Sequence, residues 1–446
     1  MRTFKNGLLL SAIVIATNGA MLPGSANAVP GKSLVTAQQQ ALDKLAMTLQ
    51  GDPAVKAARE AVIKRWREQP AATTADGEAS LVGAVDEVVY HALRAAVADE
   101  PTKPVVTWTL APAYSLGKQK IPGSRLAGDN PDRIYRFAAM DSALRYEIRG
   151  QRGAKPAQHE FSFEATGSIS MVQPAKVALY SKDIDVAADG RFVVTADSTP
   201  ANGRRNHLQL PEGTRAVMIR DTLPDWSADY NQITVVRLDG SDRPARSHEE
   251  LASEAARIIG ESAEGPLKIT DTVLKNPPNV VVPFVRPYDW GVPGNVVAIN
   301  RFSLQKDEAL VVTLLPSGAN YVAFQLTDAW SRSIDYWHHT SSLSDHQVKA
   351  NADGSITFVL SAQDPGVHNW LDNNGVRDGV YLVRWELFPQ PLPPGNAPQL
   401  VREARVVKLS ELGTALPAGM ARVTPAQRKQ QLKARTAEFA KRIATK

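Results

Sequence analysis

The stretch Asp189-Gly190-Arg191-Phe192-Val193-Val194-Thr195-Ala196 places an Asp-Gly pair directly before a short run in which polar and apolar residues alternate. Alternation with a period of two is typical of a half-buried β-strand, and an Asp-Gly pair favours a tight turn. The arrangement recurs at Asp353-Gly354, which precedes the run from Ser355 to Leu360. This recurrence predicts two β units of similar design.

Further short runs of this kind surround the two turns. We place the first β unit at residues 101–245 and the second at residues 281–410. Many short strands separated by turn signals predict a sandwich or jelly roll, so we expect a mainly β fold with two sandwich-like or jelly-roll-like units and helical additions. The other strand candidates are Arg145–Arg149, His159–Glu164, Ala216–Arg220 and Gln232–Leu238 in the first unit, and Asn295–Gln305, Ala309–Leu315, Asn320–Leu326 and Val380–Leu387 in the second.

Two segments carry a helical period instead. Residues 29–100 repeat apolar side chains at helical spacing, and we expect two or three helices packed as an N-terminal cap. Residues 246–280 form a helical connection between the β units. It opens with Ser247 three positions before Glu250, the arrangement of a capping box.

The basic character of the chain is concentrated in a predicted C-terminal helix, residues 411–446. Seven Lys or Arg residues and a single Glu lie in Thr424–Lys446, whereas the whole chain has a formal charge of +5. Nucleic-acid binding requires a basic face on the folded domain, so we expect no nucleic-acid partner. Leu432, Phe439 and Ile443 make a narrow apolar stripe, which favours a docked or solvated helix over a membrane-surface helix.

The N-terminus carries the pattern of a secretory signal peptide. Arg2 and Lys5 precede the apolar run Leu8–Ala16, and small residues lead into Ser25-Ala26-Asn27-Ala28. We expect cleavage after Ala28, hence a signal peptide at residues 1–28 and a periplasmic protein. An uncleaved anchor is the alternative. The apolar run is about half of the roughly 20 residues that span a bilayer, and no later segment approaches that length without charges, so we expect no stable membrane span.

The chain contains no cysteine, which excludes thiolate catalysis, iron–sulfur ligation and Cys-based zinc sites. The nucleophile elbow, the P-loop, the H-E-x-x-H zinc motif and the dinucleotide fingerprint are also absent from the sequence. The sequence therefore names no reaction and indicates no cofactor.

Two segments rich in aromatic and acidic residues, Asp328–His339 and Asp364–Asp372, follow predicted strands. Such loops at the ends of a β scaffold commonly carry functional groups, although their residues also suit turns and sandwich plugs. We interpret Asp328, Asp335 and Asp364 as candidate catalytic acids or bases. The candidate ligand-binding residues are Arg136, Arg301, Trp330, Tyr336 and Trp370.

The sequence supports a metal site less than it supports the candidate catalytic and ligand-binding residues. His338, His339 and His346 lie near Asp335 and Asp345, but without the fixed spacing of a known metal site, so we assign no metal. Asp372-Asn373-Asn374-Gly375 with Asp378 has some features of a calcium loop but lacks the closing Glu.

The second unit resembles domain-of-unknown-function family 1214, a family of exported bacterial proteins, from about Pro283 to Leu387. The resemblance implies a β-sandwich without an agreed activity. This chain departs from the family pattern at Ser344-Asp345-His346. The residues that carry the resemblance are Asn300-Arg301-Phe302, Tyr321–Asp328 with Trp330, Ser333-Ile334-Asp335-Tyr336, Ser341-Ser342-Leu343, Asp364–Asp372 and Arg384-Trp385.

Two classes of function stay open. The leading hypothesis is a periplasmic protein with a pocket for a small, partly apolar organic molecule, in which a carboxylate acts as general acid or base on a lyase, isomerase or hydrolase substrate. The alternative is a non-catalytic ligand-binding or assembly protein of the envelope. A homo-oligomer is compatible with both.

Overall fold

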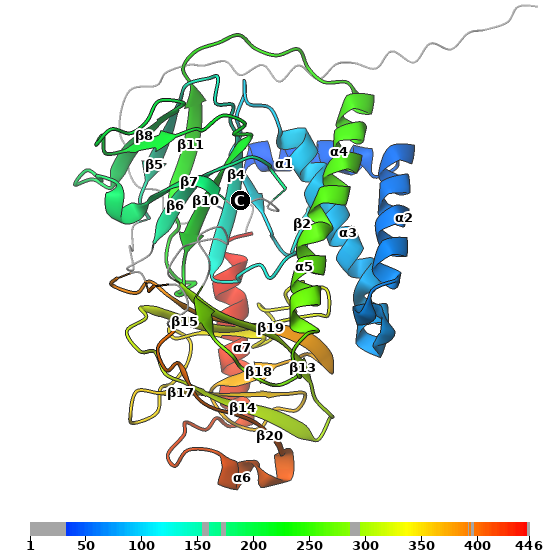
Figure 1. Cartoon of the computed structure of the whole chain (residues 1–446), viewed down its shortest axis with the longest axis vertical. Helices are drawn as coiled ribbons and strands as arrows, with labels where there is room; N and C mark the ends of the chain where they lie inside the picture. The colour runs from blue at the N-terminus through cyan, green and yellow to red at the C-terminus, as the bar shows by residue number, and fades with distance from the viewer. Residues whose placement is uncertain are drawn as a thin grey trace, which may run out of the picture.

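The computed structural model describes residues 33–153, 160–170, 175–285, 295–390, 392–393 and 397–443. The predicted signal peptide, residues 1–28, lies outside the described residues, as does His159. Figure 1 shows two β bodies stacked on one another and a layer of helices beside the first body. The fold is mainly β with helical additions, as predicted.

The helical layer contains helices that precede the first β unit in the chain and helices that follow it. Its N-caps include Thr36, Asp52 and Thr74, and α4 begins with the predicted capping box of Ser247 and Glu250. Because α4 packs on α2 and α3, the predicted cap and the predicted connection form one layer (Figure 1). The helices are α1 (Ala37–Leu49), α2 (Pro53–Arg67), the 3₁₀ turn η1 (Pro70–Thr73), α3 (Ala75–Ala98), α4 (His248–Ser262) and α5 (Glu264–Val273).

The first unit is a sandwich of a five-stranded and a four-stranded sheet. The five-stranded sheet has the order β1 (Thr107–Thr109), β4 (Arg133–Ala139), β10 (Ala216–Thr222), β6 (Phe161–Thr166), β7 (Ala175–Tyr180). The four-stranded sheet has the order β11 (Gln232–Arg237), β5 (Tyr146–Gln151), β8 (Arg191–Asp197), β9 (His207–Gln209). A separate hairpin of β2 (Tyr114–Leu116) and β3 (Gln119–Ile121) lies between the cap and this unit in the chain, and a 3₁₀ turn, η2 (Ser181–Asp183), follows β7.

The second unit repeats this topology. Its five-stranded sheet has the order β12 (Phe284–Val285), β13 (Val296–Ser303), β19 (Asp378–Glu386), β15 (Tyr321–Thr327), β16 (Ser342–Ser344). Its four-stranded sheet has the order β18 (Trp370–Asp372), β17 (Ile356–Ser361), β14 (Glu308–Leu314), β20 (Val401–Lys408). We number the strands of each unit from its own first strand and leave out the hairpin of β2 and β3. With this numbering, the order of strands in each sheet is the same in the two units. The parallel pair β8 and β9 matches the parallel pair β17 and β18.

A single asparagine in each unit shows that the likeness extends to side chains. The side-chain oxygen of Asn206 accepts the N–H of Asp185, and its amide donates to the carbonyls of Asp185 and Val193. Asn369 makes the same three hydrogen bonds with Lys349 and Thr357. The two Asp-Gly turns lie at equivalent places before β8 and β17, which confirms two units of similar design.

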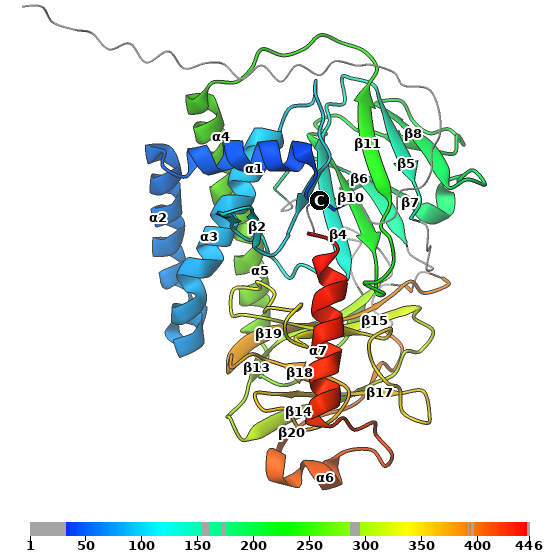
Figure 2. The ribbon, with the colours of Figure 1, turned by 180° about the vertical axis from the view of Figure 1, so that it is seen from behind.

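The C-terminal helix docks against both units. After β20 the chain forms a 3₁₀ turn, η3 (Leu409–Glu411), a short helix, α6 (Leu412–Ala415), and then α7 (Pro425–Ala440). Figure 2 shows α7 lying along the second unit and reaching the first unit with its C-terminal end. Phe439 of the predicted apolar stripe is buried, whereas Leu432 and Ile443 are half-buried.

Three arginines spaced seven residues apart, two helical turns, share the docked face of α7 and its C-terminal extension. Arg428, Arg435 and Arg442 are all buried. They donate mainly to backbone carbonyls of both units, among them those of Val367, Tyr336, Ser342 and Pro131. Within the described parts of the chain, no helix combines the length and apolar character needed to cross a bilayer.

Candidate functional site

Asp328 lies at one end of an ion-pair network that joins the second unit to the helical cap. Its carboxylate accepts the N–H groups of Trp330 and Arg332 at 3.0 and 3.1 Å and the Arg332 Nε at 2.8 Å. Arg332 also lies 3.4 Å from Glu87 of α3, and Glu87 binds Arg125. These contacts use both carboxylate oxygens of Asp328, so the structure favours a structural role for this residue.

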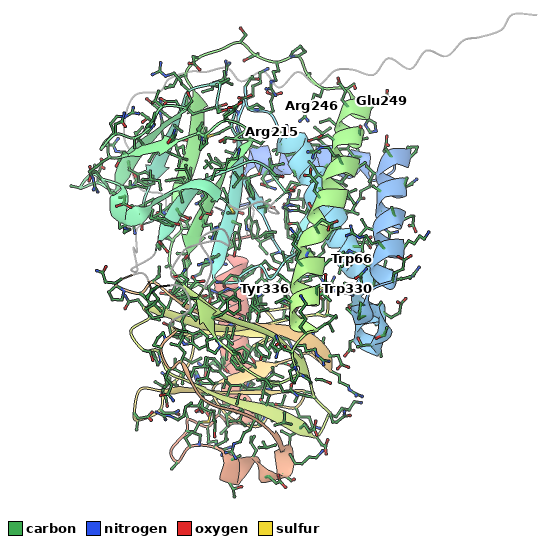
Figure 3. The ribbon with its side chains drawn as sticks, in the orientation of Figure 1. Trp66, Arg215, Arg246, Glu249, Trp330 and Tyr336 are labelled. Atoms are coloured by element: carbon green, nitrogen blue, oxygen red, sulfur yellow. The ribbon has the colours of Figure 1, made fainter. Side chains whose placement is uncertain are left out.

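Trp330 inserts into the helical cap. Its ring stacks on Trp66 of α2 with 4.7 Å between ring centroids, and its Nε1 donates to the Gly77 carbonyl at 2.8 Å. Only 1% of the Trp330 surface is exposed. Figure 3 shows the two indoles where the cap meets the second unit. Trp330 therefore fastens one part of the fold to another.

Tyr336 belongs to an aromatic cluster beneath α7. Its ring contacts Trp226 of the first unit and Phe439 of α7 edge to face, with centroids 6.0 and 5.3 Å apart. The Arg435 guanidinium lies 4.2 Å from the centroid of Trp226, within the range of a cation–π interaction. Burial without a carboxylate at hydrogen-bond distance among the described residues lowers the pKa of Arg435 to about 10.

Asp364 and Trp370 contact α7, not the cap. The Asp364 carboxylate lies 2.9 and 3.2 Å from Nε and Nη2 of Arg428 and accepts the Gly366 N–H. The Arg428 guanidinium lies 5.1 Å from the Trp370 ring centroid. The two carboxylates thus have different partners: Asp328 pairs with Arg332 of its own loop, and Asp364 pairs with Arg428 of α7.

The other predicted site residues also have protein partners. Arg136 is buried within the first unit and binds Asp221 and the Asn231 carbonyl. Asp335 accepts from His338 at 2.8 Å. Arg301 lines a hollow of only about 50 Å³ between the cap and the second unit, which is smaller than the roughly 300 Å³ of typical ligand pockets.

Among the surface hollows between described residues are five with volumes from about 10 to about 530 Å³. None of the five is lined by Asp328, Asp335 or Asp364. Trp330, Tyr336, Trp370 and Arg136 line none of them either. A shared pocket formed by these residues therefore stays a prediction that the geometry does not favour.

The three histidines considered and not assigned as metal ligands face different carboxylates. His339 lies 2.7 Å from Asp372, and His346 lies 3.7 Å from Asp225, while His338 binds Asp335. No group of three potential metal ligands occurs among the residues whose positions are described. Asp372 also accepts the Asn374 N–H, so Asp372-Asn373-Asn374-Gly375 folds as a turn.

Sequence reasoning missed a buried polar junction between the two units. The Asp132 carboxylate accepts from Trp226 Nε1 and from the Tyr321 hydroxyl, both at 2.8 Å. Arg133 of β4 binds Glu386 of β19. Burial raises the pKa of Asp132. These partners are separated by 94 to 253 positions in the chain, so no local spacing could have indicated the junction.

Asp129 adjoins this junction and lies against the loop after β15. Burial raises its pKa to about 7, opposed by the positive charge of Arg125 and by hydrogen bonds from Ser333. The Asp129 carboxylate accepts the Ser333 N–H at 3.3 Å, and none of the five hollows reaches it. Its raised pKa thus comes from the packing of the two units.

The raised pKa gives a testable pH dependence. Below about pH 4 Asp129 is protonated in both folded and unfolded chains. Between about pH 4 and pH 7 only the unfolded chain loses the proton, so the contribution of Asp129 to stability falls as pH rises. We expect Asp129→Asn, which mimics the protonated form, to gain up to about 1.4 kcal/mol per pH unit relative to the wild type over this range.

Urea denaturation of both proteins at several pH values measures this difference, and titrating groups that do not interact with Asp129 cancel in the comparison. The two proteins should be similarly stable near pH 4 and diverge toward neutral pH. A stability difference that is independent of pH would contradict the assignment.

Comparison with known proteins connects the second unit to a family. Residues 321–384, from β15 into β19, match the model described as "Protein of unknown function (DUF1214)". This segment is a DUF1214 match. The match confirms the resemblance predicted from the sequence, and the DUF1214 segment contains the predicted residues Asp328, Tyr336 and Asp364.

One solved structure shows a similar fold beyond the DUF1214 segment. The crystal structure of an uncharacterized protein from Burkholderia cenocepacia has a TM-score of 0.64 at 23% identity, covering 84% of this chain and 98% of that chain. The VPA0106 protein from Vibrio parahaemolyticus has a TM-score of 0.43 at 11% identity, covering 73% and 97%. No curated protein matches the chain. At this identity the first likeness shows the fold alone.

Proposed function

We propose that this chain is an exported envelope protein that binds a small ligand without converting it. The observation that carries the proposal is the state of the candidate catalytic carboxylates. Asp328 and Asp364 each accept hydrogen bonds from an arginine and from backbone N–H groups, and neither lines any of the five hollows. A general acid or base must reach the substrate, whereas a binding protein needs only a rigid surface with complementary groups.

Export is the second part of the proposal and rests on the N-terminal sequence. The full chain, expressed in a bacterial host, should appear in the periplasmic fraction with Val29 as its first residue. Intact mass measurement of the fractionated protein tests this. Recovery of the protein in the cytoplasm with residues 1–28 still attached would contradict export.

Binding without conversion is tested on the purified mature protein. A ligand should raise the melting temperature in a concentration-dependent way, and its NMR spectrum should stay unchanged after prolonged incubation. Chemical conversion of a bound ligand would contradict the proposal in favour of an enzyme.

Asp364→Asn separates a structural from a catalytic role for this carboxylate. Because Asp364 makes two charged hydrogen bonds to Arg428, we expect a loss of roughly 1.5–3 kcal/mol in the free energy of unfolding. Chemical denaturation measures the loss, and Asp378→Asn serves as a matched control, since among the described residues the Asp378 carboxylate forms an ion pair only with its neighbour Arg377, at 3.7 Å. Unchanged stability would contradict the docking role of Asp364.

A further inference from the structure

A hollow of about 500 Å³ lies between the first turns of α7 and the second unit. This volume is within the range of pockets that hold small organic molecules. Its polar lining combines side chains from the DUF1214 segment, Lys349 and His368, with side chains from the C-terminal segment, Arg422, Gln427 and Gln431. Ala350, Ala421 and Val423 add apolar surface.

The hydrogen bonds of the two glutamines engage their side-chain oxygens and leave their amide N–H groups without an acceptor among the described residues. The side-chain oxygen of Gln427 accepts the N–H and the hydroxyl of Thr424, at 2.8 and 3.1 Å, in the capping box of α7. The side-chain oxygen of Gln431 accepts from Arg428. A glutamine has one acceptor oxygen and one amide group with two N–H donors. Both side chains therefore offer amide N–H groups to the hollow.

The charged groups of the hollow are also donors. Neither Lys349 nor Arg422 forms an ion pair with any residue in the described ranges. Burial lowers the pKa of His368, and the positive charges of Lys349 and Arg428 lower it further. Lys349 and Arg422 therefore present positive charge to the hollow without a carboxylate partner in the described ranges.

The backbone around the hollow is held firmly. His368 donates its N–H to the Ala421 carbonyl at 2.9 Å, and Val423 donates to Gly366 at 3.0 Å, so a β-bridge fixes the chain at Arg422. Asn369 fixes Lys349 through its backbone N–H and carbonyl. The backbone of both cationic residues, Lys349 and Arg422, is therefore held in place by hydrogen bonds.

The first unit supplies an internal comparison. There the asparagine clamp of Asn206 holds Asp185, and the residue before it is Arg205. Asp185 and Arg205 form an ion pair at 2.6 Å. The equivalent residues of the second unit are Lys349 and His368, which cannot pair with each other. At the positions of this ion pair, the second unit has two groups that can both donate hydrogen bonds to a ligand.

We propose that this hollow binds a phosphate monoester on a partly apolar organic body. Lys349 and Arg422 neutralise the phosphate, which carries close to two negative charges near pH 7 and three acceptor oxygens. The amide groups of Gln427 and Gln431 donate to the remaining oxygens, and the apolar residues contact the organic part. The inference deepens the proposed binding function and rests on it.

The test uses the mature chain and phenyl phosphate, a phosphate monoester with an apolar body, as the probe, measured by isothermal titration calorimetry. We expect saturable binding that weakens at least tenfold in Lys349→Ala and in Arg422→Ala. Arg402→Ala removes an exposed cation of β20 that does not line this hollow, and it should leave the affinity unchanged. Equal weakening by Arg402→Ala would overturn the site, because it would indicate a general charge effect.

Gln427→Glu is the sharpest variant. Glutamate at this position keeps the capping-box acceptor for Thr424, so α7 should stay folded. The change removes the amide donor and adds a negative charge facing the phosphate. We expect loss of binding at unchanged melting temperature, and retained binding would overturn the proposal.

A second arm identifies the source of the phosphate. Vesicles of phosphatidic acid in phosphatidylcholine present a phosphate monoester on a lipid. Vesicle binding that is lost in Lys349→Ala, without binding of the free probe, supports the site with a headgroup as the ligand. Absence of binding in both arms overturns the inference but leaves the proposed function standing if another ligand binds unchanged. Release of inorganic phosphate from the probe would contradict the proposed function instead.

Discussion

Glu386→Gln is expected to lower the free energy of unfolding by roughly 3–5 kcal/mol, because it leaves the buried Arg133 without its ion-pair partner. Arg133 lies on β4 of the first unit and Glu386 on β19 of the second, and their side chains are at most 4% exposed. The pair joins the two five-stranded sheets. Urea denaturation of the single variant measures the loss.

The double variant Arg133→Met/Glu386→Leu separates the penalty of an unpaired charge from the value of the pair. Replacement of both ions by apolar side chains removes the buried charges together, so most of the lost stability should return. A loss below about 1 kcal/mol in Glu386→Gln, the value of an exposed pair, would contradict the buried junction.

Trp330→Ala is expected to lower the free energy of unfolding by about 3–5 kcal/mol, the usual loss when a buried tryptophan is truncated. The change removes the stack on Trp66 and leaves the Gly77 carbonyl without its indole donor. Chemical denaturation measures this loss. A ligand-binding role for Trp330 predicts instead a small change in stability and a loss of ligand affinity.

The matched experiment is a double-mutant cycle with Trp66→Ala. Because the two rings contact each other, the losses should fail to add, with a coupling energy of about 0.5–1.5 kcal/mol. Additive losses would contradict direct stacking between the cap and the second unit.

The local elements of the fold could be predicted because their signals are local. The Asp-Gly turns precede β8 and β17, the capping box of Ser247 begins α4, and the run predicted at Ala216–Arg220 lies within β10. The edge strand β20, Val401–Lys408, was missed within the predicted second unit. Charged residues at both faces of this strand hide its alternation, as is common for edge strands.

The candidate site residues were chosen from the sequence by residue type, but the partners that they contact in the folded protein could not be predicted. Asp328 and Asp364 looked equivalent in the sequence, since each follows a strand and precedes a tryptophan. One binds Arg332 next to the cap, and the other binds Arg428 of α7. The spacing of Arg428, Arg435 and Arg442 was a usable signal, because residues seven apart share a helix face.

The sequence by itself determined the mainly β class, the two similar units, the helical segments and the DUF1214 resemblance. These follow from periodicity, turn chemistry and capping, which act over a few neighbouring residues. Only the tertiary structure decided that the acidic and aromatic loops fasten the units together, and that cations and amide donors from two distant segments gather in one hollow. Burial and pairing depend on which surfaces meet, and that information is not carried by local spacing.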